Sequence, residues 1–188
     1  MIIISSYGFE SPLVSAELKE KFTTGEKVLI IPFAGFDSEL SARKTKRLLE
    51  ENGFKSENIL ICTNKEPLIY QNEKIDLIYV AGGNPFKLLN EAHSLNIIPM
   101  IKRMLSSGTA YFGASAGADF LSEDLSYLKC VEDDDFNLKS YKGLGILKEK
   151  ILCHSDQRDR GTIRAIIDTE SDRETLLIRN DEVYIVKE

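Results

Sequence analysis

Residues 109–118 read TAYFGASAGA, and this stretch decides the fold class. Thr109–Phe112 combines β-branched and aromatic residues, as buried strands do. The next five residues, Gly113–Gly117, match the pattern G-x-S-x-G, in which a serine lies on a sharp strand-to-helix turn called a nucleophile elbow. Small flanking residues are needed because larger side chains would collide with the adjoining strand and helix. The stretch therefore predicts a parallel α/β sheet with Ser115 exposed above it; the alternative is an ordinary tight turn.

Short apolar runs lie on both sides of this elbow and alternate with segments of helical period. Runs of Ile, Val and Leu without polar alternation are typical of strands that helices cover on both faces. We expect a three-layer α/β sandwich with a mostly parallel sheet, of the class I glutamine amidotransferase-like (flavodoxin-like) architecture, as one domain over residues 1–188. The expected strands are Ile2–Ser5, Lys27–Ile31, Asn58–Cys62, Ile75–Val80 and Lys150–Cys153, and the expected helices are Ser38–Asn52, Phe86–Ala92, Pro99–Leu105 and Gly161–Asp168.

The C-terminal residues predict a different arrangement. Thr175–Arg179 and Val183–Val186 are expected to form an antiparallel hairpin that turns at Asn180 and Asp181. Such a hairpin would add antiparallel strands at an edge of the sheet. Ser122–Lys142 is polar and charge-rich, and its run Glu132–Asp135 (EDDD) predicts an exposed loop.

Charge and composition argue against several classes of protein. The chain has 188 residues, 43% of them hydrophobic, and a net charge of -6. No basic stripe is present, so nucleic acid is not an expected partner. The apolar N-terminal MIII is too short for a signal peptide and is expected to be a strand, and no apolar run is long enough to span a bilayer. No membrane partner is expected, and the sequence does not predict an oligomeric state.

Cysteine and histidine are scarce. Cys62, Cys130 and Cys153 form no CxxC pair and leave one cysteine over, which favours a reducing cytoplasm over a disulfide framework. With His93 and His154 as the only histidines, we expect no metal and no cofactor, although the EDDD run could hold a hard cation weakly.

A second glycine turn, Ala81–Asn84 (AGGN), follows another expected strand. Ligand sites in open α/β sheets gather at the carboxyl ends of strands, so this turn is expected to lie beside the elbow. The backbone N–H groups of Gly83 and Ala116 would then form an oxyanion hole. The alternative is that Gly83 is required only by the turn geometry.

A nucleophilic serine needs a base. His154 ends an expected strand and opens a polar stretch, whereas His93 lies within an expected helix, so we expect His154 to be the base. The acid that would orient the imidazole stays open between Glu132–Asp135 and Asp181, because charge runs are commonly solvated turns.

Together these motifs resemble the dipeptidase E and cyanophycinase family of serine peptidases. The similar stretches are Ile31–Gly35 (IPFAG), Ala81–Asn84 with Phe86, Leu88 and Leu89, Gly113–Ala118, and Gly143–Leu147 (GLGIL) leading to His154. The resemblance implies that Ser115 is the nucleophile, that His154 is the base, and that Gly83 and Ala116 form the oxyanion hole. It implies an acid near Glu132 or Asp133, and a second acidic site at the position of Asp181.

The segment after His154 departs from that family. The family carries a TREQR-like segment whose arginine binds an N-terminal aspartate side chain, and here it is shortened to Ser155–Arg160. Arg158, Arg160 and Asn84 are the candidates for binding substrate, expected to be a small peptide with a possible acidic N-terminal residue. A glutamine amidotransferase is disfavoured because that chemistry needs cysteine where Ser115 stands. An amidase or esterase on the same machinery, or a degenerate binding protein, is the alternative.

Overall fold

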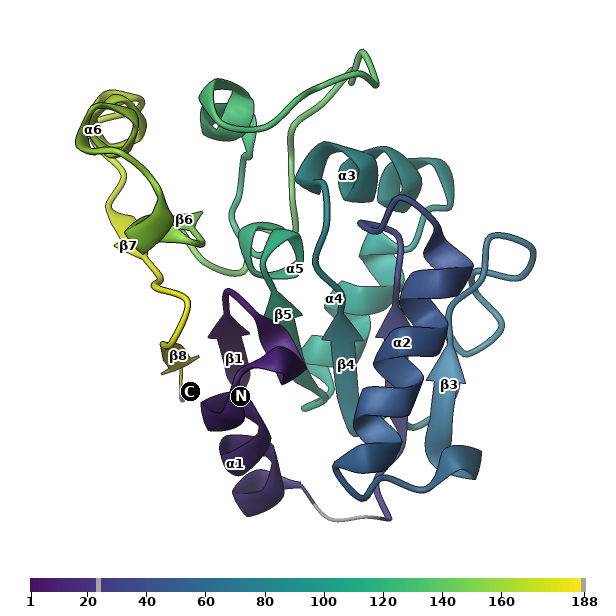
Figure 1. The fold of residues 1–188 in the computed structure, drawn as a ribbon. Helices are drawn as coiled ribbons and strands as arrows, with labels where there is room; N and C mark the ends of the chain where they lie inside the picture. The colour runs from purple at the N-terminus through teal and green to yellow at the C-terminus, as the bar shows by residue number, and fades with distance from the viewer. Residues whose placement is uncertain (23–24, 187–188) are drawn as a thin grey trace.

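The computed structural model describes residues 1–22 and 25–186. Its centre is a six-stranded sheet in the order β3-β2-β4-β5-β1-β8, shown in Figure 1. Strands β1 to β5 are parallel to their neighbours, and β8 pairs antiparallel with β1 at one edge. The strands are β1 Ile2–Ser5, β2 Val28–Ile31, β3 Ile59–Ile61, β4 Leu77–Val80, β5 Ala110–Ala114 and β8 Val183–Val186.

Helices cover both faces of this sheet, and the expected three-layer sandwich is confirmed. Successive residues of a strand point to opposite faces, so each strand contributes to two separate cores. In β4, for example, Ile78 packs in one core and Tyr79 in the other. This explains why the strands are apolar without alternation. The helices are α1 Pro12–Lys21, α2 Ser38–Glu51, α3 Pro85–Ser94, α4 Ile98–Ser106, α5 Ala116–Asp119 and α6 Arg160–Asp168, with 3-10 turns η1 Gly8–Glu10, η2 Ser56–Asn58, η3 Ser126–Cys130 and η4 Ser155–Gln157.

The predicted C-terminal hairpin is wrong. Strand β7 (Thr175–Leu177) pairs in parallel with β6 (Lys150–Leu152) in a separate two-stranded sheet, with α6 as the crossover. Ile178 continues this pairing, since its N–H donates to the Leu152 carbonyl at 2.9 Å. Residues 179–182 therefore connect two sheets and do not close a hairpin. The expected antiparallel strand at the sheet edge is present as β8.

Two further local features differ from the expectations. Helix α1 was not expected; of its residues Val14 is fully buried, and its sequence lacks a strong apolar period. The buried Lys150 was expected only as part of a strand, yet its Nζ donates to the carbonyls of Ile166 at 2.8 Å and Ile167 at 3.0 Å. Lys150 thereby satisfies carbonyls at the C-terminal end of α6, which the helix itself leaves unpaired.

Candidate active site

Ser115 lies on the sharp turn between β5 and α5, and the predicted strand–turn–helix setting is confirmed. Its backbone is strained, with φ 48° and ψ -115°. The flanking glycines are required by close backbone contacts. A Cβ at Gly113 would lie 2.4 Å from the Gly117 carbonyl oxygen, and one at Gly117 would lie 2.2 Å from the Val80 carbonyl oxygen. The elbow thus packs directly against strand β4.

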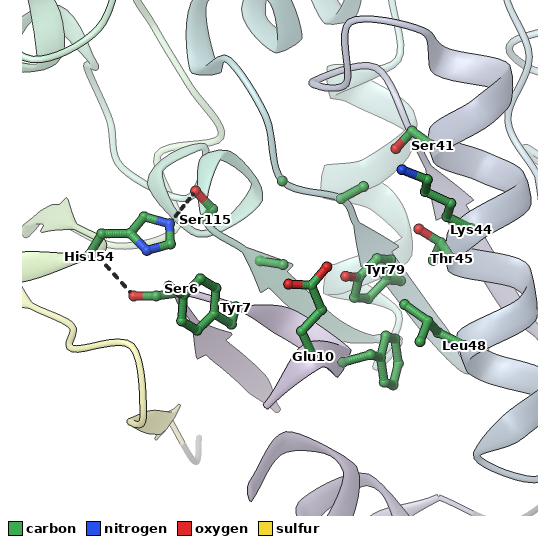
Figure 2. A pocket seen from close by; sticks show the side chains of 14 residues that line it. Ser6, Tyr7, Glu10, Ser41, Lys44, Thr45, Leu48, Tyr79, Ser115 and His154 are labelled. Atoms are coloured by element: carbon green, nitrogen blue, oxygen red, sulfur yellow. Dashed lines mark hydrogen bonds between the residues drawn. The ribbon is translucent and has the colours of Figure 1, made fainter. Parts of the chain in front are cut away.

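His154 is the imidazole that faces this serine, as Figure 2 shows. Its Nε2 lies 3.1 Å from Ser115 Oγ, within hydrogen-bonding distance. His93, by contrast, is exposed on α3, and its Nε2 lies 3.0 Å from the Lys142 carbonyl oxygen. The position predicted for His154 from the end of its strand is therefore the one observed.

The orientation of the His154 ring is fixed from several sides. Its backbone adopts a left-handed conformation, with φ 56° and ψ 34°. Its N–H donates to Ser6 Oγ at 3.0 Å, and the hydroxyl of Ser6 donates to the Ile178 carbonyl at 3.1 Å. The Tyr7 ring packs edge-on against the imidazole at a centroid distance of 5.3 Å.

The partner of the other ring nitrogen is an amide. His154 Nδ1 lies 2.6 Å from Asn180 Oδ1. An amide oxygen only accepts, so Nδ1 carries the proton of this bond and Nε2 is left with its lone pair toward Ser115. Asn180 is itself anchored, since its backbone N–H donates to Asp156 Oδ1 at 3.1 Å. The arrangement is Ser115–His154–Asn180.

We expected a carboxylate from Glu132 or Asp133 beside His154 Nδ1, and the structure has the Asn180 amide there instead. Glu132 forms an ion pair with Arg158 at 3.0 Å, and the backbone carbonyl of Asp133 accepts from Asn84 Nδ2 at 2.9 Å. Asp181 is exposed and lies 3.5 Å from Arg179. The physical reason is topological: β7 pairs with β6, so the segment after β7, which contains Asn180, lies beside the segment after β6, which contains His154.

The glycine turn after β4 packs beside the elbow, as predicted. A Cβ at Gly82 would lie 3.1 Å from Ser115 Cβ, and one at Gly83 would lie 2.2 Å from the Ala34 carbonyl oxygen. Gly83 has φ 141°, a conformation that other residues rarely adopt. The Ala34 carbonyl also accepts from Asn84 N–H at 2.9 Å. The loop after β2 thus supports the turn that carries Gly83.

The three candidates for substrate binding have other partners or positions. Asn84 caps α3, with its Oδ1 accepting from Lys87 N–H at 2.8 Å. The guanidinium of Arg158 pairs with Glu132. Arg160 is exposed at the first position of α6.

Asp119, a buried acid on α5 directly after the elbow, was not predicted from the sequence. This residue on α5 is 6% exposed, and among the described residues its Oδ1 has no hydrogen-bond partner. Its carboxylate accepts a hydrogen bond from the backbone N–H of Cys153. Burial raises the pKa of Asp119 well above its usual value, and the negative charge of Glu132 raises it further, against the opposing effect of Arg158.

A cavity of about 290 Å³ opens on the other side of Ser115, between η1 and α2 (Figure 2). Tyr7, Phe9 and Tyr79 supply aromatic walls. Glu10 and Lys44 point into the cavity with opposite charges, and neither forms an ion pair with another residue that the structure describes. The remaining lining residues are Ser6, Ser41, Thr45, Leu48, Ala81, Gly82, Ala114, Ser115 and His154.

Fold and site together define a class: an α/β hydrolytic enzyme with a serine–histidine pair at the carboxyl end of a parallel sheet. The family model of peptidase family S51 matches residues 1–188, and the chain belongs to this family. It is therefore a peptidase, and the resemblance to dipeptidase E is confirmed.

Named relatives agree with this family. The chain is 29% identical over 174 residues to an uncharacterized peptidase of Listeria monocytogenes, covering 85% of each. It is 24% identical over 173 residues to Peptidase E of a Nostoc species, covering 86% of the chain and 65% of the relative. With Peptidase E of Pasteurella multocida the match is 36% over 98 residues, covering 50% of the chain and 40% of the relative. The chain thus spans less than two thirds of these two Peptidase E relatives.

Solved structures share the fold. A crystal structure from Listeria monocytogenes, described as a candidate Peptidase E protein, superposes with a TM-score of 0.76 at 24% identity, covering 97% of this chain and 91% of that one. A peptidase from an acI-B1 actinobacterium superposes with a TM-score of 0.62 at 20% identity, covering 97% and 82%. Within residues 1–22 and 25–186, no helix is long and apolar enough to cross a membrane.

Proposed function

We propose that this S51 peptidase is a serine-type enzyme that hydrolyses short peptides through an acyl-enzyme on Ser115. One observation carries the proposal: Ser115 Oγ lies 3.1 Å from an imidazole nitrogen whose ring partner, Asn180, lies 2.6 Å from the opposite nitrogen. A nucleophile beside a base that a third group orients is the arrangement that activates a serine.

The chemistry follows from these positions. Ser115 Oγ attacks the scissile carbonyl carbon while its proton passes to His154 Nε2. The N–H groups of Gly83 and Ala116 bind the oxyanion, a role that the contact of the glycine turn with the elbow supports. His154 then gives the proton to the leaving amine as the C–N bond breaks. Water next attacks the acyl carbon while His154 takes its proton, and His154 passes that proton to Ser115 Oγ as the ester bond breaks. The Asn180 amide stabilises the imidazolium by accepting from Nδ1, as asparagine does in Cys-His-Asn peptidases.

The cavity beside Ser115 favours a short peptide with free ends. An extended dipeptide spans at most about 7 Å, so both charged ends would lie close to the scissile bond. Glu10 offers a carboxylate for an α-ammonium group, and Lys44 offers an ammonium for a carboxylate. The preference for an acidic N-terminal residue belongs to this proposal. Lys44 and Arg160 are the candidate cations, since neither forms an ion pair with another residue that the structure describes.

Two broader statements belong to the same proposal. We propose that residues 1–188 act as one domain, since the site draws on residues near both ends of the described chain, Ser6 and Asn180. We also propose a cytoplasmic location, which the three free cysteines support.

Labelling with a fluorophosphonate probe tests the serine mechanism. We expect wild type to be labelled at Ser115, and Ser115→Ala to lose labelling and at least about 10⁴-fold in kcat on its best dipeptide while keeping its Tm. A screen of dipeptides and acyl p-nitroanilides that includes Asp-Leu, Ala-Leu and Asn-Leu would then separate a dipeptidase from an amidase or esterase. An unlabelled wild type would favour a binding protein, and equal rates on the three dipeptides would eliminate the acidic preference.

A further inference from the structure

The backbone at His154 requires support from outside. A left-handed non-glycine residue persists only when its surroundings hold it in place. The N–H of His154 is held by Ser6, as described above. The peptide on its N-terminal side, that of Cys153, is held by a second set of groups that the proposed chemistry does not use.

Cys153 is held at several atoms. Its N–H donates to the Asp119 carboxylate, and its carbonyl oxygen accepts from Arg158 Nε at 3.5 Å. Its Sγ lies 3.7 Å from the backbone carbonyl oxygen of Ser115. Cys153, the residue directly before His154, is thereby attached both to the elbow and to the side chains of Asp119 and Arg158.

The side chains of Asp119 and Arg158 form a linked set with Glu132. Arg158 Nη2 lies 3.0 Å from Glu132 Oε1, with the two side chains 21% and 30% exposed. The charge of Glu132 raises the pKa of Asp119 and that of Arg158 lowers it. Asp119 follows Ser115 by four residues on α5, whereas Arg158 follows His154 by four residues. The set Asp119–Arg158–Glu132 therefore joins the helix of the nucleophile to the loop of the base.

We propose that Asp119, Arg158 and Glu132 are positioning residues, which hold the Cys153 peptide and thereby keep the His154 imidazole within bonding distance of Ser115. This proposal rests on the proposed serine mechanism. Arg158 was a candidate for binding a substrate carboxylate, and Glu132 was a candidate for orienting the imidazole directly. The proposal gives both residues a positioning role instead. Displacing a catalytic group by about 1 Å costs on the order of 10²-fold in rate, so the loss of this set would act on the chemical step.

The experiment compares Arg158→Ala with Arg164→Ala, whose side chain is 82% exposed in a surface pair with Asp168. A fluorophosphonate carries no carboxylate, so its reaction with Ser115 does not depend on carboxylate recognition. We expect Arg158→Ala to lower the labelling rate, and kcat on Ala-Leu and Asp-Leu alike, by roughly 10- to 100-fold with KM for Ala-Leu unchanged. Arg164→Ala should behave as wild type.

A pair of Glu132 variants separates positioning from loss of the fold. Glu132→Gln keeps an oxygen that accepts from Arg158 and should retain most of the labelling rate. Glu132→Ala has no such oxygen and should lose most of the labelling rate. Rates are normalised to the folded fraction from near-UV circular dichroism. Wild-type labelling of folded Arg158→Ala, or a rise in KM for Asp-Leu alone, would overturn the proposal. A wild type that is neither labelled nor active would instead refute the serine mechanism itself.

Discussion

Asn180→Ala tests whether the amide contributes to turnover. The substitution removes the acceptor that lies 2.6 Å from His154 Nδ1. A hydrogen bond from a charged imidazolium contributes about 1.5–3 kcal/mol, and each 1.36 kcal/mol changes a rate tenfold. The expected fall in kcat is therefore roughly 10- to 150-fold. It is smaller than the effect of removing the aspartate of a Ser-His-Asp triad, because a neutral amide stabilises the imidazolium less than a carboxylate does.

The assay is steady-state hydrolysis of the best dipeptide, with the fluorophosphonate labelling rate as a measure of Ser115 reactivity. Asn64→Ala is the control, because Asn64 is an exposed loop asparagine far from these contacts in the sequence. Asn180→Asp should keep or raise kcat, since a charge-assisted bond is about twice as strong as a neutral one. If folded Asn180→Ala retains the wild-type kcat and labelling rate, the amide has no catalytic role and this reasoning is refuted.

Three further predictions concern stability. Gly83→Ala should lower the free energy of unfolding by about 2 kcal/mol or more in urea titration, because its Cβ would lie 2.2 Å from a carbonyl oxygen. Gly108→Ala is the control, because Gly108 also has a positive φ but open space around it, and it should lower the free energy of unfolding by less. Equal losses would mean that the positive φ, and not the close contact, causes the effect. The pKa of Asp119 is higher in the folded state than in the unfolded state. Its contribution to the free energy of unfolding is therefore fully present below the unfolded-state pKa of about 3.9 and is lost as pH rises through the folded-state pKa. Asp119→Asn should therefore gain stability relative to wild type as pH rises from about 4, whereas a parallel curve, like that expected of exposed Asp135→Asn, would contradict this. Lys150→Met should cost about 2–4 kcal/mol by leaving carbonyls at the end of α6 unpaired, and an unchanged Tm would show that water replaces the ammonium.

The parts of the site that were predictable from sequence are local. Ser115 and its glycines are specified by backbone contacts within a few residues and the next strand, so their pattern is visible in the chain. His154 was recognisable because it ends a strand. The three layers followed from apolar runs that fill two cores at once.

The parts that sequence did not reveal depend on contacts between distant segments. Asn180 lies beside His154 only because β7 pairs with β6, whereas the sequence favoured a hairpin with β8. Asp119 resembles any polar residue at the end of a short helix, and its burial arises from packing against the Cys153 segment. A signal for Asn180 does exist: it is a polar side chain shortly after a strand, and the same kind of signal identified His154.

The backbone anchor of His154 has a consequence for the timing of synthesis. His154 bonds to Ser6, 148 positions earlier in the chain, and to Asn180, 26 positions later. Its setting therefore requires segments that emerge from the ribosome far apart in time. Contacts between such distant segments form late because they close long loops. A chain that has emerged only as far as the elbow carries Ser115 without His154, the imidazole that lies beside it in the folded protein. We therefore expect the proposed serine activity to be complete only after translation has passed Asn180.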